Sequence, residues 1–535
     1  MPEKQTATVA KTAGLLMLTM TISRVLGYVR DSVILNKIGQ NRITDIYQAA
    51  YLVPDFLFAI LISGALSAAV IPVFSQYVAT GRKQEGWKIV SIVFNWTMSI
   101  LLLGVILGEI FTPQLVHILV TGFDAEATKM TVDLTRIMFA QVIFLSLAGF
   151  SMAVLNSHKI FAPSAFASTT YNLGTILGGI FLAAPIEKIW PGYGVAGFSV
   201  GVVLGALTQF LVQIPALGRL DLEYHPSFDF RQPGVKKMFA LMVPIMIGLS
   251  VSELNIFVNI NLGSGLEGGA ITAFRIAQRL MLIPTSIFGI PIAIAILPTL
   301  STQFARGETA AFREYSSMGI RSVLFLCLPI AVGMAILGTP LIRFMYEFSD
   351  KFGSADTLLT SQVLIYLCLG LASYGLVHVL NRIYYSFQDT ITPVIMGVAS
   401  IVVNVVFSLI FVKLMAQNGL ALAYSLAGIF NIALLLIFMR RKMGRIDGRR
   451  LLLSTGQMLV ASATMGAVVW MALRLINQFI VPSGKLTQAI ELFIPTLLGA
   501  GVYVLVAKLW KMEELDQALA MVFKRRKKAS ALGEE

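Results

Sequence analysis

The first and eighth long apolar segments of the chain each contain two arginines, at positions where an ionised side chain is costly. Arg24 and Arg30 lie in the first such segment, and Arg275 and Arg279 lie four residues apart in the eighth. A charge at the centre of a membrane helix costs roughly 2.5–3.5 kcal/mol, so it usually faces a water-filled cavity. Guanidinium groups bind phosphate in a bidentate manner. If these arginines converge in one cavity, we expect an anionic substrate with more than one phosphate.

Carboxylates near the first two arginines leave a second interpretation open. Asp31 lies seven residues after Arg24, which is two helical turns along the same face, and Asp45 precedes the second apolar segment. We expect both acids to be charge partners of the arginines. The arginines therefore either bind a ligand, or extend to the lipid headgroup layer and pair with these acids.

Three polar residues in the seventh and tenth apolar segments are candidates for a coupling-cation site. They are Glu253, Asn259 and Asn381. Oxygen ligands of this kind suit Na⁺ or an H⁺ relay better than a transition metal. The alternative is a hydrogen-bonded polar helix face. The two cysteines, Cys327 and Cys368, lie in apolar runs, so we expect neither a disulfide framework nor a zinc cluster, and no bound cofactor.

The composition indicates which elements must position these side chains. Hydrophobic residues make up 56% of the 535 residues and charged residues 13%, whereas a soluble domain is about 25% charged. This excludes a string of soluble domains and a disordered chain, and it predicts an all-α polytopic membrane protein. The net charge of +13 comes mostly from short loops and the tail, so we expect no nucleic-acid partner. The sequence contains no Walker loop or hydrolase motif, which favours a transporter over an enzyme.

Fourteen apolar segments are each long enough to cross about 30 Å of hydrocarbon as a helix. They span residues 12–36, 46–79, 86–111, 131–155, 162–185, 193–217, 236–262, 268–303, 315–345, 358–386, 391–414, 418–439, 451–477 and 487–510. Lys and Arg concentrate after the even-numbered segments, which predicts that both termini lie in the cytoplasm. We expect the basic tail, with KRRKK at 524–528, to contact anionic headgroups of membrane lipids.

Two motif pairs share nearly the same offset, which indicates an internal repeat. Pro72 in IPVFSQY is followed 226 residues later by Pro298 in LPTLSTQF, and the VLN that ends at Asn156 returns 225 residues later, ending at Asn381. A repeat of six helices gives two parallel lobes around a central cavity. The predicted domains are an N-lobe at 1–225, a C-lobe at 226–445, two extra helices at 446–512 and a basic tail at 513–535.

Several motifs together resemble the MurJ/MviN family of bacterial lipid II flippases, which belongs to the MOP superfamily. The motifs are SRVLGYVRD at 23–31, TDIYQAAYLVPDF at 44–56, GALSAAVIPVFSQY at 64–77, QRLMLIP at 278–284, ILPTLS at 296–301 and LNRIYYSFQDTITPV at 380–394. The resemblance implies two six-helix lobes plus two extra helices that hold the lipid tail, in the bacterial cytoplasmic membrane. It implies alternating-access transfer of undecaprenyl-pyrophosphate-linked peptidoglycan precursor, lipid II, from the inner to the outer leaflet. The cell-wall synthesis machinery is an expected partner.

The resemblance also assigns individual residues. The family's cavity arginines match Arg24 and Arg30 in the first helix and Arg279 in the eighth, and its second-helix aspartate matches Asp45. Arg275 is a possible further phosphate ligand.

The chain departs from some family members at two charged positions. Phe58 stands where they carry a second-helix arginine, and Leu282 stands where they carry an acid after the eighth-helix arginine. A phosphate site would therefore be built differently here. The candidate residues also leave other functions open. A flippase for another polyprenyl-linked saccharide would need the same cavity charge. A cation-coupled multidrug antiporter of the same superfamily would depend on carboxylates and tolerate loss of the arginines, and a scaffold protein would tolerate every cavity substitution.

Overall fold

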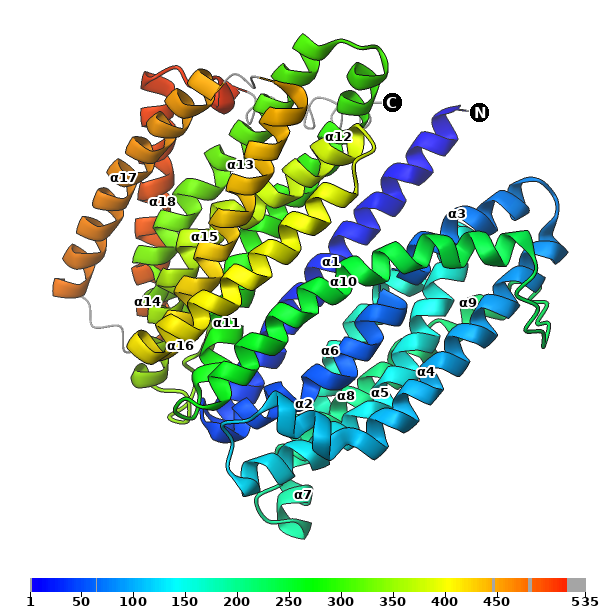
Figure 1. Cartoon of the computed structure of the whole chain (residues 1–535). Coiled ribbons are helices and arrows are strands. Elements are labelled where there is room, and N and C mark those ends of the chain that lie inside the picture. Colours follow the sequence, from blue (N-terminus) through cyan, green and yellow to red (C-terminus); the bar gives the residue numbers. More distant parts are fainter. Residues whose placement is uncertain (1, 64, 445–447, 480–483, 517–535) are drawn as a thin grey trace. The chain divides into compact units, whose positions relative to one another are not determined.

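The computed structural model describes residues 2–63, 65–444, 448–479 and 484–516, and every regular element in them is a helix (Figure 1). The predicted tail motif at 524–528 lies outside the described residues. The first ten helices are α1 (Pro2–Ile38), α2 (Arg42–Phe58), α3 (Ala65–Ala79), α4 (Lys83–Leu119), α5 (Ala125–Ser157), α6 (Ala162–Phe181), α7 (Ala183–Ile189), α8 (Ala196–Leu211), α9 (Ile214–Leu217) and α10 (Pro233–Ser264). The others are α11 (Ala270–Pro284), α12 (Ile290–Ala305), α13 (Thr309–Ile336), α14 (Gly338–Tyr346), α15 (Ser354–Ser386), α16 (Ile391–Met443), α17 (Gly448–Phe479) and α18 (Lys485–Leu509).

The helices coincide with the apolar segments predicted from the sequence. All fourteen segments lie on helices, which confirms the all-α membrane class. Among the described residues, ten stretches are long and apolar enough to cross a membrane, or eleven when α6 and α7, bent by 45° at their junction, count as one. The total of fourteen spans stays a prediction.

Two predicted segments, 46–79 and 268–303, are interrupted within their helical course. Wider π-helical turns, η1 (Ala59–Ser63) and η2 (Thr285–Gly289), separate α2 from α3 and α11 from α12. Pro54 lies five residues before η1, and Pro284 lies directly before η2. Proline cannot donate a backbone hydrogen bond and crowds the preceding turn, so it favours such breaks. The long helix α16 contains Ala416 at φ 49° and ψ −129°, between the two segments predicted there.

The described chain forms two compact units. Met1–Thr272 with Phe348–Phe352 forms the first unit, and Ala273–Glu347 with Gly353–Glu535 forms the second. The division therefore falls within α11, and α10 belongs to the first unit. The lobe boundaries inferred from the repeat stay a prediction.

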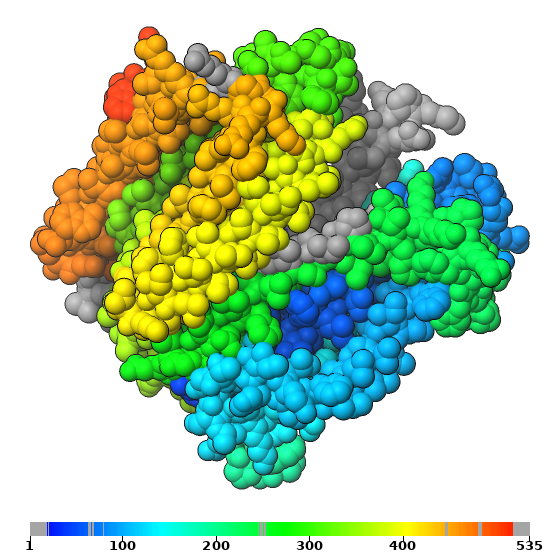
Figure 2. Space-filling view, viewed as in Figure 1, coloured from blue at the N-terminus to red at the C-terminus, as the bar shows by residue number. Residues whose placement is uncertain are grey.

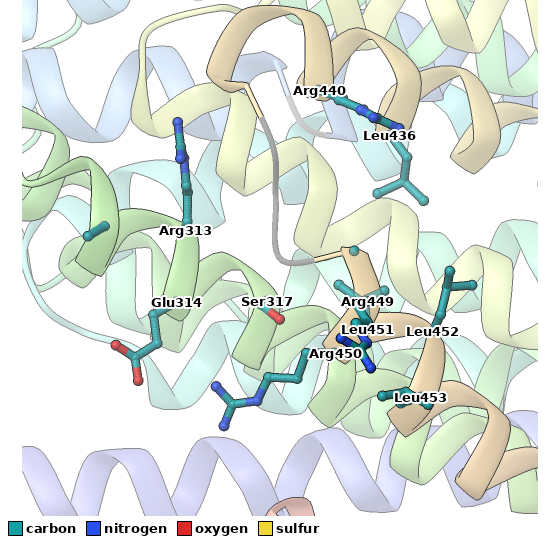
Figure 3. A pocket seen from close by; sticks show the side chains of 12 residues that line it. Arg313, Glu314, Ser317, Leu436, Arg440, Arg449, Arg450, Leu451, Leu452 and Leu453 are labelled. Atoms are coloured by element: carbon teal, nitrogen blue, oxygen red, sulfur yellow. The ribbon is translucent and has the colours of Figure 1, made fainter.

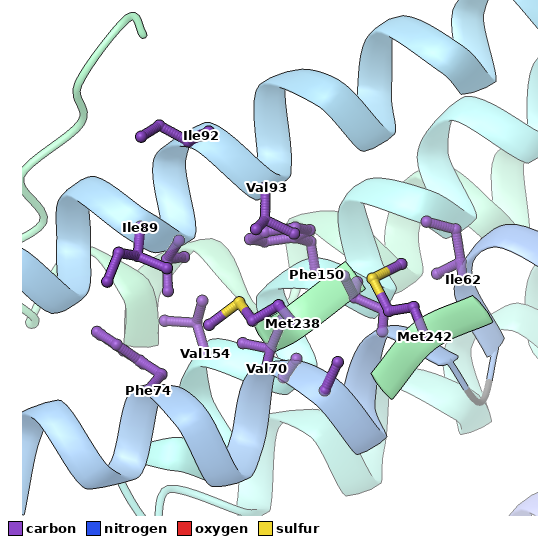
Figure 4. Packing of buried hydrophobic residues seen from close by; sticks show 14 of the residues in the cluster. Ile62, Val70, Phe74, Ile89, Ile92, Val93, Phe150, Val154, Met238 and Met242 are labelled. Atoms are coloured by element: carbon purple, nitrogen blue, oxygen red, sulfur yellow. The ribbon is translucent and has the colours of Figure 1, made fainter. Parts of the chain in front are cut away.

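The first unit contains a large apolar core between α3, α4, α5 and α10. Figure 4 shows side chains from these four helices meeting in that core, among them Phe74, Ile92, Phe150 and Met238. Elsewhere in this unit, α6 and α8 approach at the level of their backbones. A Cβ atom built on Gly178 would lie 2.3 Å from the Cα of Gly201. Small residues at such a crossing allow close packing of membrane helices.

Buried polar contacts attach α18 to the rest of the second unit. Arg321 of α13 donates to Glu514 at 2.6 Å, and Arg343 of α14 donates to Glu491 of α18 at 3.1 Å. Both carboxylates are buried. Each pair satisfies a carboxylate that would be costly to bury alone. These pairs therefore fix α18 to the rest of the second unit near both of its ends.

Another ion pair fixes the turn between α15 and α16. Asp389 accepts hydrogen bonds from Lys442 and from the backbone N–H of Thr392, the latter at 2.9 Å. Partial burial raises the pKa of Asp389, but the hydrogen bonds from Lys442 and Thr392 lower it further, to about 2. The contact joins the start of α16 to its last turn, and so holds its two halves together as a hairpin.

Candidate functional site

Arg30 is held on α1 by two neighbours in the first unit. Its Nε and Nη2 atoms donate to one oxygen of Asp31, at 3.1 and 2.9 Å, and its Nη1 atom donates to the side-chain oxygen of Asn172 on α6 at 3.2 Å. Asn172 in turn donates to the backbone carbonyl of Ser23, at 3.1 Å. Three of the five guanidinium N–H groups are thus used within the described chain, and two are available to an anion.

Asp31 forms an ion pair with Arg30, its neighbour on α1. The pairing of Asp31 with Arg24 across two helical turns stays a prediction. Asp31 is buried, whereas the side chain of Arg30 remains 17% exposed. The buried carboxylate thus orients a guanidinium that still reaches solvent. Arg24 lies six residues earlier on α1 and is exposed.

A second polar group in the first unit was not predicted from the sequence. The hydroxyl groups of Tyr51 on α2 and Tyr171 on α6 contact each other, and Tyr171 donates to Gln141 of α5 at 3.1 Å. Both tyrosines interact electrostatically with Arg30. Their signal in the sequence is weak, because Tyr51, Tyr171 and Asn172 are single polar residues within apolar helices.

Asp45 lies fully buried on α2 and binds the beginning of α11. It accepts hydrogen bonds from the backbone N–H groups of Gly269 and Thr272, at 2.7 and 2.8 Å, and from the Thr272 hydroxyl at 2.7 Å. A carboxylate at a helix N-terminus satisfies free N–H groups and complements the helix dipole. Asp45 therefore holds the first residues of α11 within the first unit.

A positive charge on the same turn of α2 stabilises the end of α10, the helix before α11. Arg42, one turn before Asp45, donates to the carbonyls of Ser264 and Leu266, at 3.1 and 2.7 Å, where α10 ends. The connection itself is tight: Gly269 has φ +95°, and a Cβ there would lie 2.7 Å from the carbonyl oxygen of Gln40. The first turn of α2 thus binds both ends of the α10–α11 connection.

The arginines predicted on the eighth segment lie in the second unit. Arg275 and Arg279 are half-buried and one turn apart on α11. The Tyr424 ring packs on Phe274 and stacks on Tyr374, and Arg275 interacts electrostatically with Tyr424. Arg275 therefore has an aromatic environment.

The two positions that depart from the family pattern carry apolar side chains. Phe58, the last residue of α2, is half-buried, and Leu282 on α11 is 37% exposed. Neither position supplies a charge.

The candidate cation ligands come from different helices. Glu253 is half-buried on α10, and Asn259 is buried one and a half turns later. The amide nitrogen of Asn259 donates to the backbone and side-chain oxygens of Asn255, at 2.9 and 2.8 Å, while its own side-chain oxygen is buried without a hydrogen-bond donor. That oxygen fits a cation ligand. Asn381 is half-buried on α15 in the second unit. Among the described residues, no three His, Cys, Asp or Glu side chains are grouped as a metal site.

Comparison with known proteins places this chain in a family. A family model described as "Lipid II flippase MurJ" matches residues 34–505. A probable lipid II flippase MurJ from Vibrio cholerae is 33% identical over 433 residues, covering 79% of this chain and 81% of the relative. A probable lipid II flippase MurJ from Haemophilus influenzae is 31% identical over 477 residues, covering 86% of this chain and 91% of the relative.

Solved structures give the same result. A structure of lipid II flippase MurJ in an inward closed conformation aligns with a TM-score of 0.76 at 26% identity, and covers 93% of this chain and 98% of that one. An inward-facing multidrug resistance MATE transporter of the MOP superfamily aligns with a TM-score of 0.62 at 16% identity, covering 81% of this chain and 99% of its own. The second likeness shows a shared fold alone.

Proposed function

Because the match over residues 34–505 shows that the chain belongs to the lipid II flippase MurJ family, we propose that it moves lipid II by alternating access from the inner to the outer leaflet. The family consists of transporters, and the chain is a multi-pass inner-membrane protein with at least ten apolar spans among the described residues. Lipid II carries a pyrophosphate between its polyprenyl tail and its sugar headgroup, so the protein must bind a multiply charged anion.

The geometry of Arg30 is the observation that best supports this function. Asp31 and Asn172 fix the guanidinium plane and leave two N–H donors for a ligand. Two donors on one rigid fork match two phosphate oxygens. The proposal assigns Arg24 and Arg30 of the first unit, and Arg275 and Arg279 of the second, to the pyrophosphate. Asp31 and Asp45 act as positioning residues.

The proposal also assigns an energy source and an orientation. With a negative-inside membrane potential, outward movement of an anion is favoured by about 2.3 kcal/mol per charge per 100 mV. Na⁺ or H⁺ bound at Glu253, Asn259 and Asn381 would return the empty carrier. Both termini lie in the cytoplasm in this scheme, the two six-helix lobes run parallel, and the polyprenyl tail lies along α17 and α18.

The leaflet distribution of lipid II in depleted cells tests the function. A strain without a redundant flippase is depleted of the protein, and lipid II exposed on the outer leaflet is measured with a probe that does not cross the membrane. We expect inner-leaflet accumulation that the wild type reverses, and that Arg24→Ala and Arg279→Ala do not reverse at equal protein levels. Arg306→Ala is the matched control, because Arg306 is exposed just after α12. An unchanged distribution on depletion would contradict the function.

A further inference from the structure

A cavity of about 1180 Å³ lies within the second unit, between α13, the end of α16 and the beginning of α17 (Figure 3). It is separate from the residues assigned to the pyrophosphate. Four arginines line it: Arg313 from α13, Arg440 from α16, and Arg449 and Arg450 from α17. Figure 2 shows α16 in yellow and α17 in orange on the visible surface of this unit.

The charge of this cavity is only partly compensated by protein carboxylates. Arg450 donates to Glu513 at 2.6 Å, and this hydrogen bond, with Arg321 as a second partner, holds the pKa of Glu513 below its usual range. Arg313 donates to the carbonyl of Met443 at 2.6 Å, a neutral acceptor that leaves its charge in place. Arg440 and Arg449 are both exposed. Glu314 of α13 also lines the cavity. With Glu513, two carboxylates therefore face four arginines, and the cavity keeps an excess of positive charge.

Two polar atoms at the cavity wall point to a ligand. Ser317 is 3% exposed and its hydroxyl has no hydrogen-bond partner. The Nε atom of Arg313, four residues earlier on α13, is also buried without an acceptor. Buried polar groups in native structures are nearly always hydrogen-bonded, so a pair of unsatisfied donors at one cavity calls for an acceptor. A phosphate supplies several acceptor oxygens.

The apolar part of the wall indicates that this phosphate is attached to a lipid. Leu436, Leu451, Leu452 and Leu453 line the cavity beside the arginines. Leu452 is 76% exposed and Leu453 is 61% exposed. They lie in the first turns of α17, a helix that begins at Gly448 and is apolar enough to span the membrane. A basic cluster directly beside exposed leucines at a helix end matches the boundary between headgroups and acyl chains.

We propose that this cavity binds an acidic membrane phospholipid, with the phosphate held by Arg313, Arg440 and Arg449 and the Ser317 hydroxyl, and an acyl chain against Leu452 and Leu453. The bound lipid links α13, α16 and α17, and so helps to hold the two extra helices in place. It is a structural lipid and not the transported substrate.

Lipid binding by the purified full chain tests this inference. Delipidated protein in detergent is titrated with phosphatidylglycerol or phosphatidylcholine, and bound lipid is counted by native mass spectrometry. We expect phosphatidylglycerol to bind at least tenfold more tightly, with affinity falling as NaCl rises. Arg440→Gln with Arg449→Gln should weaken it by roughly a hundredfold, which corresponds to about 2.8 kcal/mol. Arg306→Gln, which removes one exposed cation outside the cavity, should leave it unchanged.

Four results would overturn the proposal. They are equal binding of both lipids, unchanged phosphatidylglycerol binding in the double variant, displacement by inorganic phosphate at the concentration of the lipid, and displacement by lipid II. The third result would mean that the cavity recognises phosphate without a lipid, and the fourth would make it a substrate site. Size-exclusion profile and thermal unfolding establish that the double variant is folded. A Ser317→Ala variant removes one hydroxyl and no charge, and it should weaken phosphatidylglycerol binding several-fold.

Discussion

Replacement of Asp45 should destabilise the beginning of α11. The size of the effect should depend on how many hydrogen-bond acceptors the new side chain keeps, and not on its charge alone. Its carboxylate accepts three hydrogen bonds, two from Thr272 and one from Gly269, in a fully buried position. Asp45→Ala leaves all three donors without an acceptor. Asp45→Asn keeps one oxygen for Thr272, but places an amide N–H₂ opposite the Gly269 N–H.

The two variants should therefore differ in magnitude. Removing one partner of a buried, charged hydrogen-bond group costs about 3–5 kcal/mol, which we expect for Asp45→Ala. Losing one of three bonds costs about 1–2 kcal/mol, which we expect for Asp45→Asn. Asp124→Ala is the matched control: Asp124 caps α5 through a single bond to Ala127 at 2.7 Å. Loss of such a cap costs about 1 kcal/mol.

Thermal unfolding in detergent, together with hydrogen–deuterium exchange of peptides over residues 265–280, measures these effects. Exchange at Gly269 and Thr272 should rise sharply in Asp45→Ala, moderately in Asp45→Asn, and not at all in Asp124→Ala. If Asp45→Ala left exchange over 265–280 at the wild-type level, Asp45 would not hold α11, and the reasoning would be refuted.

Three further predictions concern packing, pH and the extra helices. Gly178→Ala should destabilise the first unit by roughly 1–3 kcal/mol, because its Cβ would meet the backbone of α8; Gly397→Ala, with open space around it, should be neutral in the same thermal-unfolding series. Asp389 has a folded-state pKa of about 2, below the usual value of about 3.9. Its contribution to stability is therefore present above about pH 4 and lost towards pH 2, so Asp389→Asn should flatten the dependence of the unfolding midpoint on pH in that window. Glu491→Gln removes the buried counterion of Arg343 and should cost roughly 2–3 kcal/mol, seen as faster proteolysis within α18; unchanged proteolysis would contradict the anchoring role.

The elements of this fold could be predicted from the sequence because membrane helices need long apolar segments. The segments at 391–414 and 418–439 are separated at Ala416 in the structure, and the predicted segment 268–303 contains the break after Pro284. Both features follow from local composition and backbone chemistry. The family could be recognised for a different reason, since its motifs extend along the chain.

The polar contacts could not be predicted, because they depend on how each helix is rotated in the bundle. Asp45 and Thr272 lie 227 residues apart in sequence, and nothing in either segment indicates the other. The pair between Arg30 and Asp31 joins adjacent residues, which helical spacing does not indicate. Helical periodicity fixes the face of a residue but not its partner.

Transfer of lipid II by the purified protein in liposomes tests the central claim most directly. The fraction of lipid II that becomes accessible on the opposite leaflet is measured for the wild type, Arg30→Lys and Arg30→Ala. Lysine keeps the charge but loses the planar fork that Asp31 and Asn172 orient. The account predicts rapid transfer by the wild type, a rate about tenfold lower in Arg30→Lys, and a lower rate still in Arg30→Ala. Wild-type transfer rates in both variants would contradict it.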